Sequence, residues 1–211
     1  MPLTDDVEVR RRRSPQAVAS AERREEILDA AVEAFADKGF NGSSIRDVAG
    51  RAGLSHTGVL HHFPDKAALL EAVLDRSVRA AGDDFQLDDR DAEHFLRGFI
   101  ALAARDAARG VAGSETRMFR LIAAESLSAS HPAHGYMRRW YARVRARAAE
   151  ALEDLDERGL LTIPRGEIPV AAAQIAGLRD GLDPQWMLDP DAIDLVAAVR
   201  DHLSRYTSLE L

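Results

Sequence analysis

The chain of 211 residues contains no cysteine, which excludes disulfide bonds, thiolate zinc sites and cysteine nucleophiles together. No stretch approaches the roughly 18 consecutive apolar residues of a membrane-spanning helix, and the polar N-terminus lacks the apolar core of a signal peptide. Aromatic residues make up only 6% of the chain, whereas 46% of it is hydrophobic and 30% is charged. We therefore expect a globular cytoplasmic protein with no membrane partner.

Lysine is scarce, because Lys38 and Lys66 are the only examples and arginine supplies the other basic side chains. Taken alone, the formal net charge of −7 disfavours a nucleic-acid partner, but the distribution of charge along the chain matters more than the total. Residues 1–66 hold 10 basic and 11 acidic side chains, and residues 67–211 hold 18 and 24. The first part therefore permits DNA binding without establishing it. Its run Arg10–Arg13 fits a solvated tail and a DNA-binding arm equally well.

The motifs of catalysis are also missing, since there is no nucleophile elbow, no phosphate-binding loop and no zinc-protease motif. The only imaginable catalytic set is Glu125 with His94 or His131. Adjacent His61 and His62 would point to different faces of a helix, so they do not predict a metal site. We expect no catalytic residue, no metal and no cofactor, and a helical enzyme stays only as a remote alternative.

Apolar residues recur at helical spacing and no useful strand-like alternation occurs, so we predict an all-α chain. Residues 1–20 lack this periodicity and are expected to form a disordered basic arm. The first helix is expected from Ala21 to a left-handed glycine at Gly39. Pro184 should kink a helix or end it early. After three helices within residues 21–63, the others are expected at about 66–80, 92–109, 115–129, 133–158, 170–183 and 191–206.

The stretch RAGLSHTGVLHHFPDK, residues 51–66, stops one helix and starts another with little room to turn. Just before it, Ser44 and Asp47 have the spacing of a capping box, which starts a helix that Gly53 then ends. Ser55 can cap the next helix at once, because its hydroxyl accepts from free backbone amides of the new first turn. Two short helices joined by a tight glycine turn predict a helix-turn-helix, whose second helix enters the major groove of DNA.

Residues 24–74 resemble the DNA-binding domain of the TetR/AcrR family of transcriptional regulators. The resemblance rests on the segments AAVEAFADKGF, IRDVAGRAGLS and HHFPDKAALL, which occur in the order and spacing of that family. The segment IAGLRDGLDPQWMLDPDAIDL, residues 175–195, is similar to the dimerising helix pair of these proteins. The resemblance implies a three-helix DNA-binding domain at residues 21–66 after the arm, and a helical domain for effector binding and dimerisation at residues 67–211.

The resemblance also implies which positions meet DNA, although two residues depart from the family pattern. Leu60 replaces a common tyrosine that reaches a phosphate, and Gly58 replaces a more usual threonine or alanine. Lys66 stands where the family commonly holds a phosphate. The implied DNA-binding residues are Ser43, Ser44, Arg46, Ser55, His56, Thr57, Gly58, His61 and Lys66.

For the second domain, the resemblance implies a pocket for an unknown small molecule and an interface between two copies of the chain. We expect a largely apolar effector near Trp140 and Met118. The candidate pocket residues are Phe99, Leu102, Arg117, Met118, Leu121, Glu125, Trp140, Tyr141 and Gln174. The candidate dimer contacts are Ile175, Leu178, Leu182, Ile193, Val196, Arg200 and Leu203.

The implied function is that of a ligand-responsive transcriptional regulator. As a homodimer it would bind a palindromic operator in double-stranded DNA, repress transcription, and leave the operator when the effector occupies the pocket. A regulator that answers to a protein partner, or acts without an effector, is the main alternative, and activation in place of repression stays open.

Overall fold

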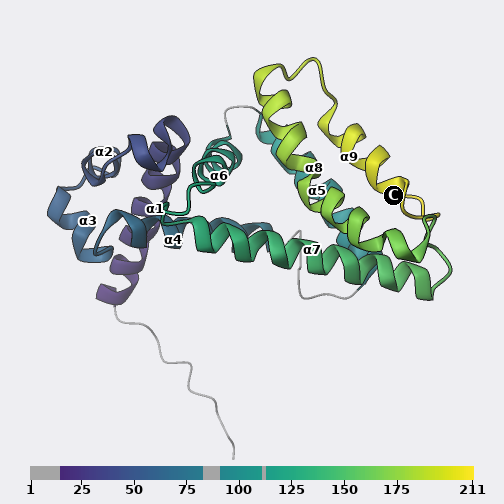
Figure 1. Cartoon of the computed structure of the whole chain (residues 1–211). Helices are drawn as coiled ribbons and strands as arrows, with labels where there is room; N and C mark the ends of the chain where they lie inside the picture. The colour runs from purple at the N-terminus through teal and green to yellow at the C-terminus, as the bar shows by residue number, and fades with distance from the viewer. Residues whose placement is uncertain (1–14, 83–90, 111–112) are drawn as a thin grey trace, which may run out of the picture.

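The computed structural model describes residues 15–82, 91–110 and 113–211, and the regular elements in these ranges are helices (Figure 1). They are α1 (Pro15–Gly42), α2 (Ile45–Arg51), α3 (His56–His62), α4 (Lys66–Gly82), α5 (Ala92–Arg109), α6 (Ser114–Glu125), α7 (His134–Glu157), the short 3₁₀ helix η1 (Arg165–Glu167), α8 (Ile168–Leu188) and α9 (Leu195–Ser204). The all-α prediction is confirmed. None of the helices in the described ranges is both long and apolar enough to cross a membrane.

The ends of several helices differ from the predictions. Helix α1 begins at Pro15, so residues 15–20 are helical and not part of a disordered arm, while the run Arg10–Arg13 lies outside the described residues. Helix α6 stops at Glu125, well before the expected residue 129, because the Ser126 hydroxyl donates to the Ala123 carbonyl at 2.7 Å and the chain turns. Such local side-chain bonds compete with helix continuation.

Two ends of the C-terminal helix pair also need correction. Helix α8 does not end early at Pro184 but continues to Leu188, and a kink at Pro184, the other outcome expected there, stays a prediction. The Gln185 side-chain amide donates to the Gly181 carbonyl at 2.9 Å, which supplies a donor in the turn that the proline disturbs. Helix α9 starts later than residue 191, because the Asp194 side chain accepts from the Ala197 N–H at 2.9 Å and caps it.

A first hydrophobic core joins α1, α2, α3 and α4 with parts of α6 and α7. Ile27 and Phe35 of α1 are completely buried in it, as are Met118 and Ile122 of α6. Helix α1 packs more extensively against α6 than against any other helix. The first core therefore extends beyond the domain boundary expected between residues 66 and 67.

A second core is formed where α5, α7, α8 and α9 pack together. Leu152 of α7, Ile175 of α8 and Val199 of α9 are completely buried there. Figure 1 shows α7 running from the first group of helices to the second, with α8 and α9 above its far half. Because Met137 near its start lies in the first core and Leu152 in the second, α7 is one continuous helix that connects the two.

Candidate nucleic-acid interface and ligand pocket

The helix-turn-helix begins with the capping box that the sequence predicts. The Ser44 hydroxyl accepts from the Asp47 N–H at 3.2 Å, and the Asp47 carboxylate accepts from the Ser44 N–H at 2.9 Å. The Lys38 ammonium lies 2.7 Å from the other Asp47 oxygen. Hydrogen bonds lower the pKa of Asp47 to about 2, and the bond from Lys38 has a larger effect than the bond from Ser44. These contacts fasten the start of α2 to the end of α1.

The turn between α2 and α3 depends on a glycine and a serine. Gly53 has φ +65°, a left-handed conformation that disfavours other residues, and the next N–H, of Leu54, donates to the Ala49 carbonyl at 2.9 Å. The Ser55 hydroxyl then accepts from the Gly58 N–H at 3.0 Å and caps α3. A β-carbon at Gly58 would lie 3.3 Å from that hydroxyl, so the missing side chain at residue 58 leaves room for the cap.

The first turn of α3 projects hydrogen-bonding side chains outward. Its residues His56 and Thr57 are exposed, and so is His61 one turn later. Val59 faces the other way and is completely buried in the first core. Six of the expected DNA-binding residues therefore lie on the surface, and these are Ser44, Arg46, Ser55, His56, Thr57 and His61.

Two residues expected at the DNA are instead engaged within the chain. Ser43 is buried, and its hydroxyl donates to the Phe40 carbonyl at 3.0 Å. The Lys66 ammonium donates to the carbonyls of Phe40 and Ser43 at 2.7 and 2.8 Å, and it lies 4.1 Å from the centre of the Phe40 ring. Burial lowers the pKa of Lys66. In this conformation the Lys66 ammonium is engaged by two backbone carbonyls and one ring, so the expected phosphate contact stays a prediction that would require it to leave these partners.

The end of α1 is also held by the end of α6. The Glu125 carboxylate accepts from the backbone N–H groups of Phe40 and Asn41 at 2.8 and 3.3 Å. Gly39 has φ +69°, and a β-carbon there would lie 2.4 Å from a Glu125 oxygen. Three side chains hold this turn, and we call them the α1 clasp. They are Glu125, Lys66 and His131, and His131 is described next.

His131 completes the α1 clasp from the loop before α7. Its ring meets the Phe40 ring edge-on with centroids 5.0 Å apart, and its Nε2 lies 3.5 Å from the Glu125 carboxylate. Because His131 Nδ1 accepts from the Ala133 N–H at 3.1 Å, the ring proton belongs on Nε2, facing Glu125. Burial lowers the pKa of His131, which favours this neutral form.

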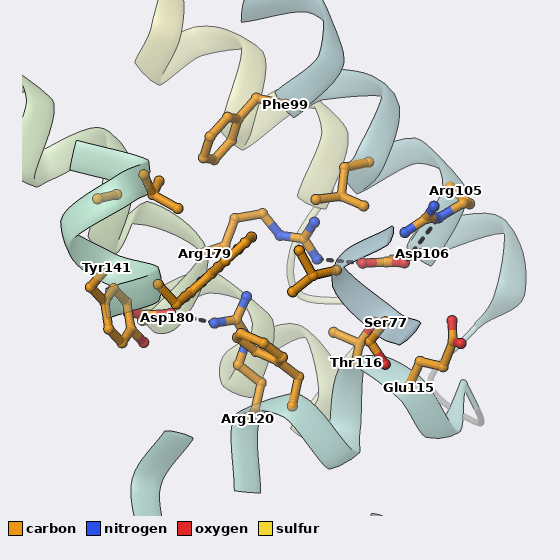
Figure 2. Close-up of a pocket in the computed structure, with 16 residues that line it drawn as sticks. Ser77, Phe99, Arg105, Asp106, Glu115, Thr116, Arg120, Tyr141, Arg179 and Asp180 are labelled. Atoms are coloured by element: carbon orange, nitrogen blue, oxygen red, sulfur yellow. Dashed lines mark hydrogen bonds and ion pairs between the residues drawn. The ribbon is translucent and has the colours of Figure 1, made fainter. Parts of the chain in front are cut away.

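A cavity of about 120 Å³ lies between α4, α5, α6, α7 and α8. Its walls combine aromatic and aliphatic side chains with a hydroxyl-bearing side and a charged side (Figure 2). The Phe119 and Trp140 rings meet edge-on in this wall, with centroids 5.8 Å apart. The lining residues are Ser77, Val78, Phe99, Leu102, Arg105, Asp106, Glu115, Thr116, Phe119, Arg120, Trp140, Tyr141, Val144, Ala176, Arg179 and Asp180.

The charged residues on one side of the cavity belong to a continuous series of ion pairs, which we call the ion-pair chain and which passes through Asp183 behind the wall. Arg179 pairs with Asp106 at 2.8 Å and with Asp183 at 2.7 Å. Arg120 donates to Asp183 at 2.8 Å and also pairs with Asp180. At the other end Arg105 lies 3.8 Å from Asp106. The members in order are Arg105, Asp106, Arg179, Asp183, Arg120 and Asp180, so positive and negative groups alternate and balance.

Four of the expected effector residues line this cavity, namely Phe99, Leu102, Trp140 and Tyr141. The other five do not. Met118 is completely buried in the first core, Glu125 binds the end of α1, and the exposed Gln174 accepts from the Tyr206 hydroxyl at 2.9 Å. Arg117 and Leu121 lie on the exposed side of α6.

For α6, the sequence-based prediction placed the wrong side of the helix at the cavity. Two sides of α6 are covered, because Met118 and Ile122 pack on α1 while Thr116, Phe119 and Arg120 face the cavity. An amphipathic pattern shows that a face is buried but not which neighbour covers it. The Arg/Asp spacing on α8, Arg179 followed by Asp183, is the one signal that could have pointed to the charged side.

The candidate dimer surface is also shifted relative to the prediction. Ile175 and Leu203 have no exposed surface in the single chain, because both lie in the second core, so they cannot contact a partner. Leu178, Leu182, Ile193 and Val196 pack partly against the same core, and Arg200 is exposed. The face of α8 that remains exposed carries small or uncharged residues, which are Val170, Ala173, Gln174, Gly177, Gly181, Pro184, Gln185 and Leu188.

A capped helix-turn-helix with an exposed second helix, joined to a helical domain with its own cavity, defines a DNA-binding transcriptional regulator. Residues 27–73 match the model of the bacterial regulatory proteins of the tetR family. The regulator BetI of Paraburkholderia phymatum is 27% identical, with 84% of this chain and 88% of that protein covered. The repressor KstR2 of Mycolicibacterium smegmatis is 41% identical over 54 residues, which is 26% of each chain.

Solved structures show the same fold. A TetR-family regulator from Agrobacterium tumefaciens superposes with a TM-score of 0.74 at 20% identity, covering 89% of this chain and 99% of that one. SmeT, a repressor from Stenotrophomonas maltophilia, matches in its triclosan complex with a TM-score of 0.71 at 20% identity, covering 89% and 92%. The chain therefore carries the DNA-binding domain of the tetR family of bacterial regulatory proteins, and the curated relatives that it matches are transcriptional regulators.

Proposed function

We propose that the protein is a homodimeric repressor that binds a palindromic operator and leaves it when a small molecule occupies the cavity beside Trp140. In this proposal residues 21–66 contact DNA and residues 67–211 bind effector and partner, in the cytoplasm where the operator lies. The exposed hydrogen-bonding side chains on the first turn of α3 support base reading, because histidine and threonine can bond to base edges in the major groove.

One observation carries the ligand-responsive part of the proposal. Helix α6 contributes Thr116, Phe119 and Arg120 to the cavity wall, and its last residue Glu125 binds the backbone at the end of α1. An effector that displaces α6 would therefore act directly on the helix-turn-helix. Only a ligand with unequal affinity for the DNA-bound and free conformations can shift their populations, so the effector must favour the free one.

The dimer part of the proposal rests on the exposed face of α8. Gly177 and Gly181 lie on that face, and a β-carbon at either would have no neighbour within 4 Å in the single chain. Small residues permit two helices to approach closely, and a two-fold axis through this face would make it self-complementary. Two recognition helices could then meet successive major grooves about 34–36 Å apart.

Selection of bound DNA from a random pool tests the proposal and supplies the operator sequence. We expect a palindrome with half-sites about one helical turn apart. The His56→Ala and Thr57→Ala variants should change the preferred bases, at about 1–3 kcal/mol for each lost good contact. Ser128→Ala, in the exposed loop after α6, is the control and should recover the wild-type sequence. No enrichment, or a site without two-fold symmetry, would contradict the proposal.

A further inference from the structure

The size of the cavity limits the ligand that it can hold. Its volume is about 120 Å³, and an apolar cavity of about 150 Å³ in another protein accommodates benzene. Phe99, Phe119 and Trp140 provide aromatic wall on several sides. Aromatic rings pack favourably edge-to-face or offset at such distances, as Phe119 and Trp140 already do. The cavity therefore suits a ligand with one aromatic ring.

The charged groups of the wall leave no charge for a ligand to neutralise. The ion-pair chain holds three arginines and three aspartates in alternation, and the remaining acid of the lining, Glu115, pairs with Arg109 at 3.0 Å. The centre of the ion-pair chain is dry, since the Arg179 and Asp183 side chains are 5% and 0% exposed. A charged ligand would have to lose its hydration and also break a pair in this chain, which is costly at a buried site.

One polar group of the wall does lack a partner among the described residues. The Ser77 hydroxyl oxygen is buried and makes no hydrogen bond there. Figure 2 shows Ser77 next to Thr116 and Glu115, across the cavity from Tyr141. A buried hydroxyl without a partner costs stability, which a ligand hydroxyl or carbonyl placed beside it would recover. Ser77 belongs to α4, which also carries Lys66 at its first residue.

From these observations we infer that the cavity binds an uncharged one-ring aromatic ligand with a hydroxyl or carbonyl group, and that Ser77 is the residue that selects this group. This inference rests on the proposed function, because it names the class of effector for the same cavity. It also places the ligand's polar contact on α4, the helix that follows the helix-turn-helix, while its ring packs against Phe119 of α6.

Four probes of one size test the charge and the hydroxyl separately: benzyl alcohol, benzoate, benzylammonium and toluene. Binding is followed by Trp140 fluorescence in a Trp186→Phe chain, in which Trp140 is the only tryptophan, and by thermal shift. We expect benzyl alcohol to bind at least tenfold more tightly than either ion. Equal or tighter binding of benzoate or benzylammonium, or no binding by any probe, would overturn the inference.

The Ser77→Ala variant tests the selecting residue. Alanine is the best helix former and removes an unpartnered hydroxyl, so the variant should fold and melt no lower than the wild type. We expect its affinity for benzyl alcohol to fall about tenfold toward that of toluene, and its affinity for toluene to stay unchanged. Ser128→Ala is the control and should change neither. Equal effects of Ser77→Ala on both ligands, or no effect, would contradict the assigned role.

Operator release is measured separately, so that the two hypotheses can fail independently. If the probes bind with the expected pattern but do not release operator DNA, the proposed function is wrong and the ligand class stands. If a charged compound binds in the cavity more tightly than benzyl alcohol and releases operator DNA, the proposed function stands and the ligand class is wrong.

Discussion

Glu125 and Phe40 are 85 residues apart in the chain, yet the Glu125 carboxylate accepts a hydrogen bond from the Phe40 N–H at 2.8 Å. The bond joins the last residue of α6, whose earlier turns line the cavity, to the turn that ends α1. Lys66 and His131 hold the same turn from two other directions. The α1 clasp thus links the cavity-lining helix α6 to the end of the first helix of the DNA-binding domain.

Substitution of Gly39 tests how closely the α1 clasp fits. Gly39→Ala should destabilise the fold by about 1–3 kcal/mol, because φ is +69° and the new β-carbon would meet the Glu125 carboxylate. Urea unfolding measures this loss, with Gly50→Ala in α2 as the control, since a β-carbon there has no neighbour within 4 Å. In a Glu125→Ala background the cost should be smaller, because only the strained φ remains. An equal cost in both backgrounds would show that Glu125 does not press on this turn.

Lys66 should act on stability and not as a phosphate contact. The Lys66→Met change leaves the carbonyls of Phe40 and Ser43 without their donor, so we expect a loss of about 1–3 kcal/mol in urea unfolding. The slope of log affinity for operator DNA against log salt should stay at the wild-type value. Arg46→Met, at an exposed position, should reduce that slope by about one. A reduced slope in Lys66→Met would restore the phosphate role that the sequence suggested.

The lowered pKa of Asp47 predicts that the stability of the fold decreases at acid pH. Its pKa in the folded chain is lowered from 3.8 to about 2 by Lys38 and Ser44. Since the folded value lies below the unfolded one, the carboxylate stabilises the fold above about pH 4 and this contribution is lost as the pH falls toward 2. Asp47→Asn should therefore be less stable than the wild type at pH 6, and the difference should shrink below pH 4. A difference that is constant from pH 6 to pH 3 would contradict this origin.

The exposed face of α8 predicts where the dimer can be broken. Gly177→Glu would bring two like charges to the two-fold axis, so we expect the dissociation constant of the dimer to rise at least tenfold in analytical ultracentrifugation. The fold of each chain should survive, because the new side chain has no neighbour in the monomer. Gly166→Glu, also exposed and without neighbours, is the control. A wild-type chain that sediments as a monomer at micromolar concentration would remove the interface altogether.

Local features of this protein could be predicted from the sequence, and contacts between distant helices could not. The capping box at Ser44, the turn at Gly53 and the cap at Ser55 depend on residues within a few positions of one another. The roles of Lys66 and Glu125 depend on a turn 26 and 85 residues away, respectively. A helix such as α6, covered on two sides, shows one broad apolar pattern, so the sequence could not separate its core residues from its cavity residues.

We propose that the cavity and the operator are coupled through α6 and the α1 clasp. The test is the affinity of one releasing compound for the Trp186→Phe chain, measured by Trp140 fluorescence with and without saturating operator. Linkage requires that operator DNA lowers the affinity for the compound by the same factor by which the compound lowers the affinity for operator DNA. In Glu125→Ala, where both bonds to the α1 turn are lost, that factor should fall toward one while each partner still binds alone. A compound that releases operator DNA yet binds equally well with and without it would contradict this coupling.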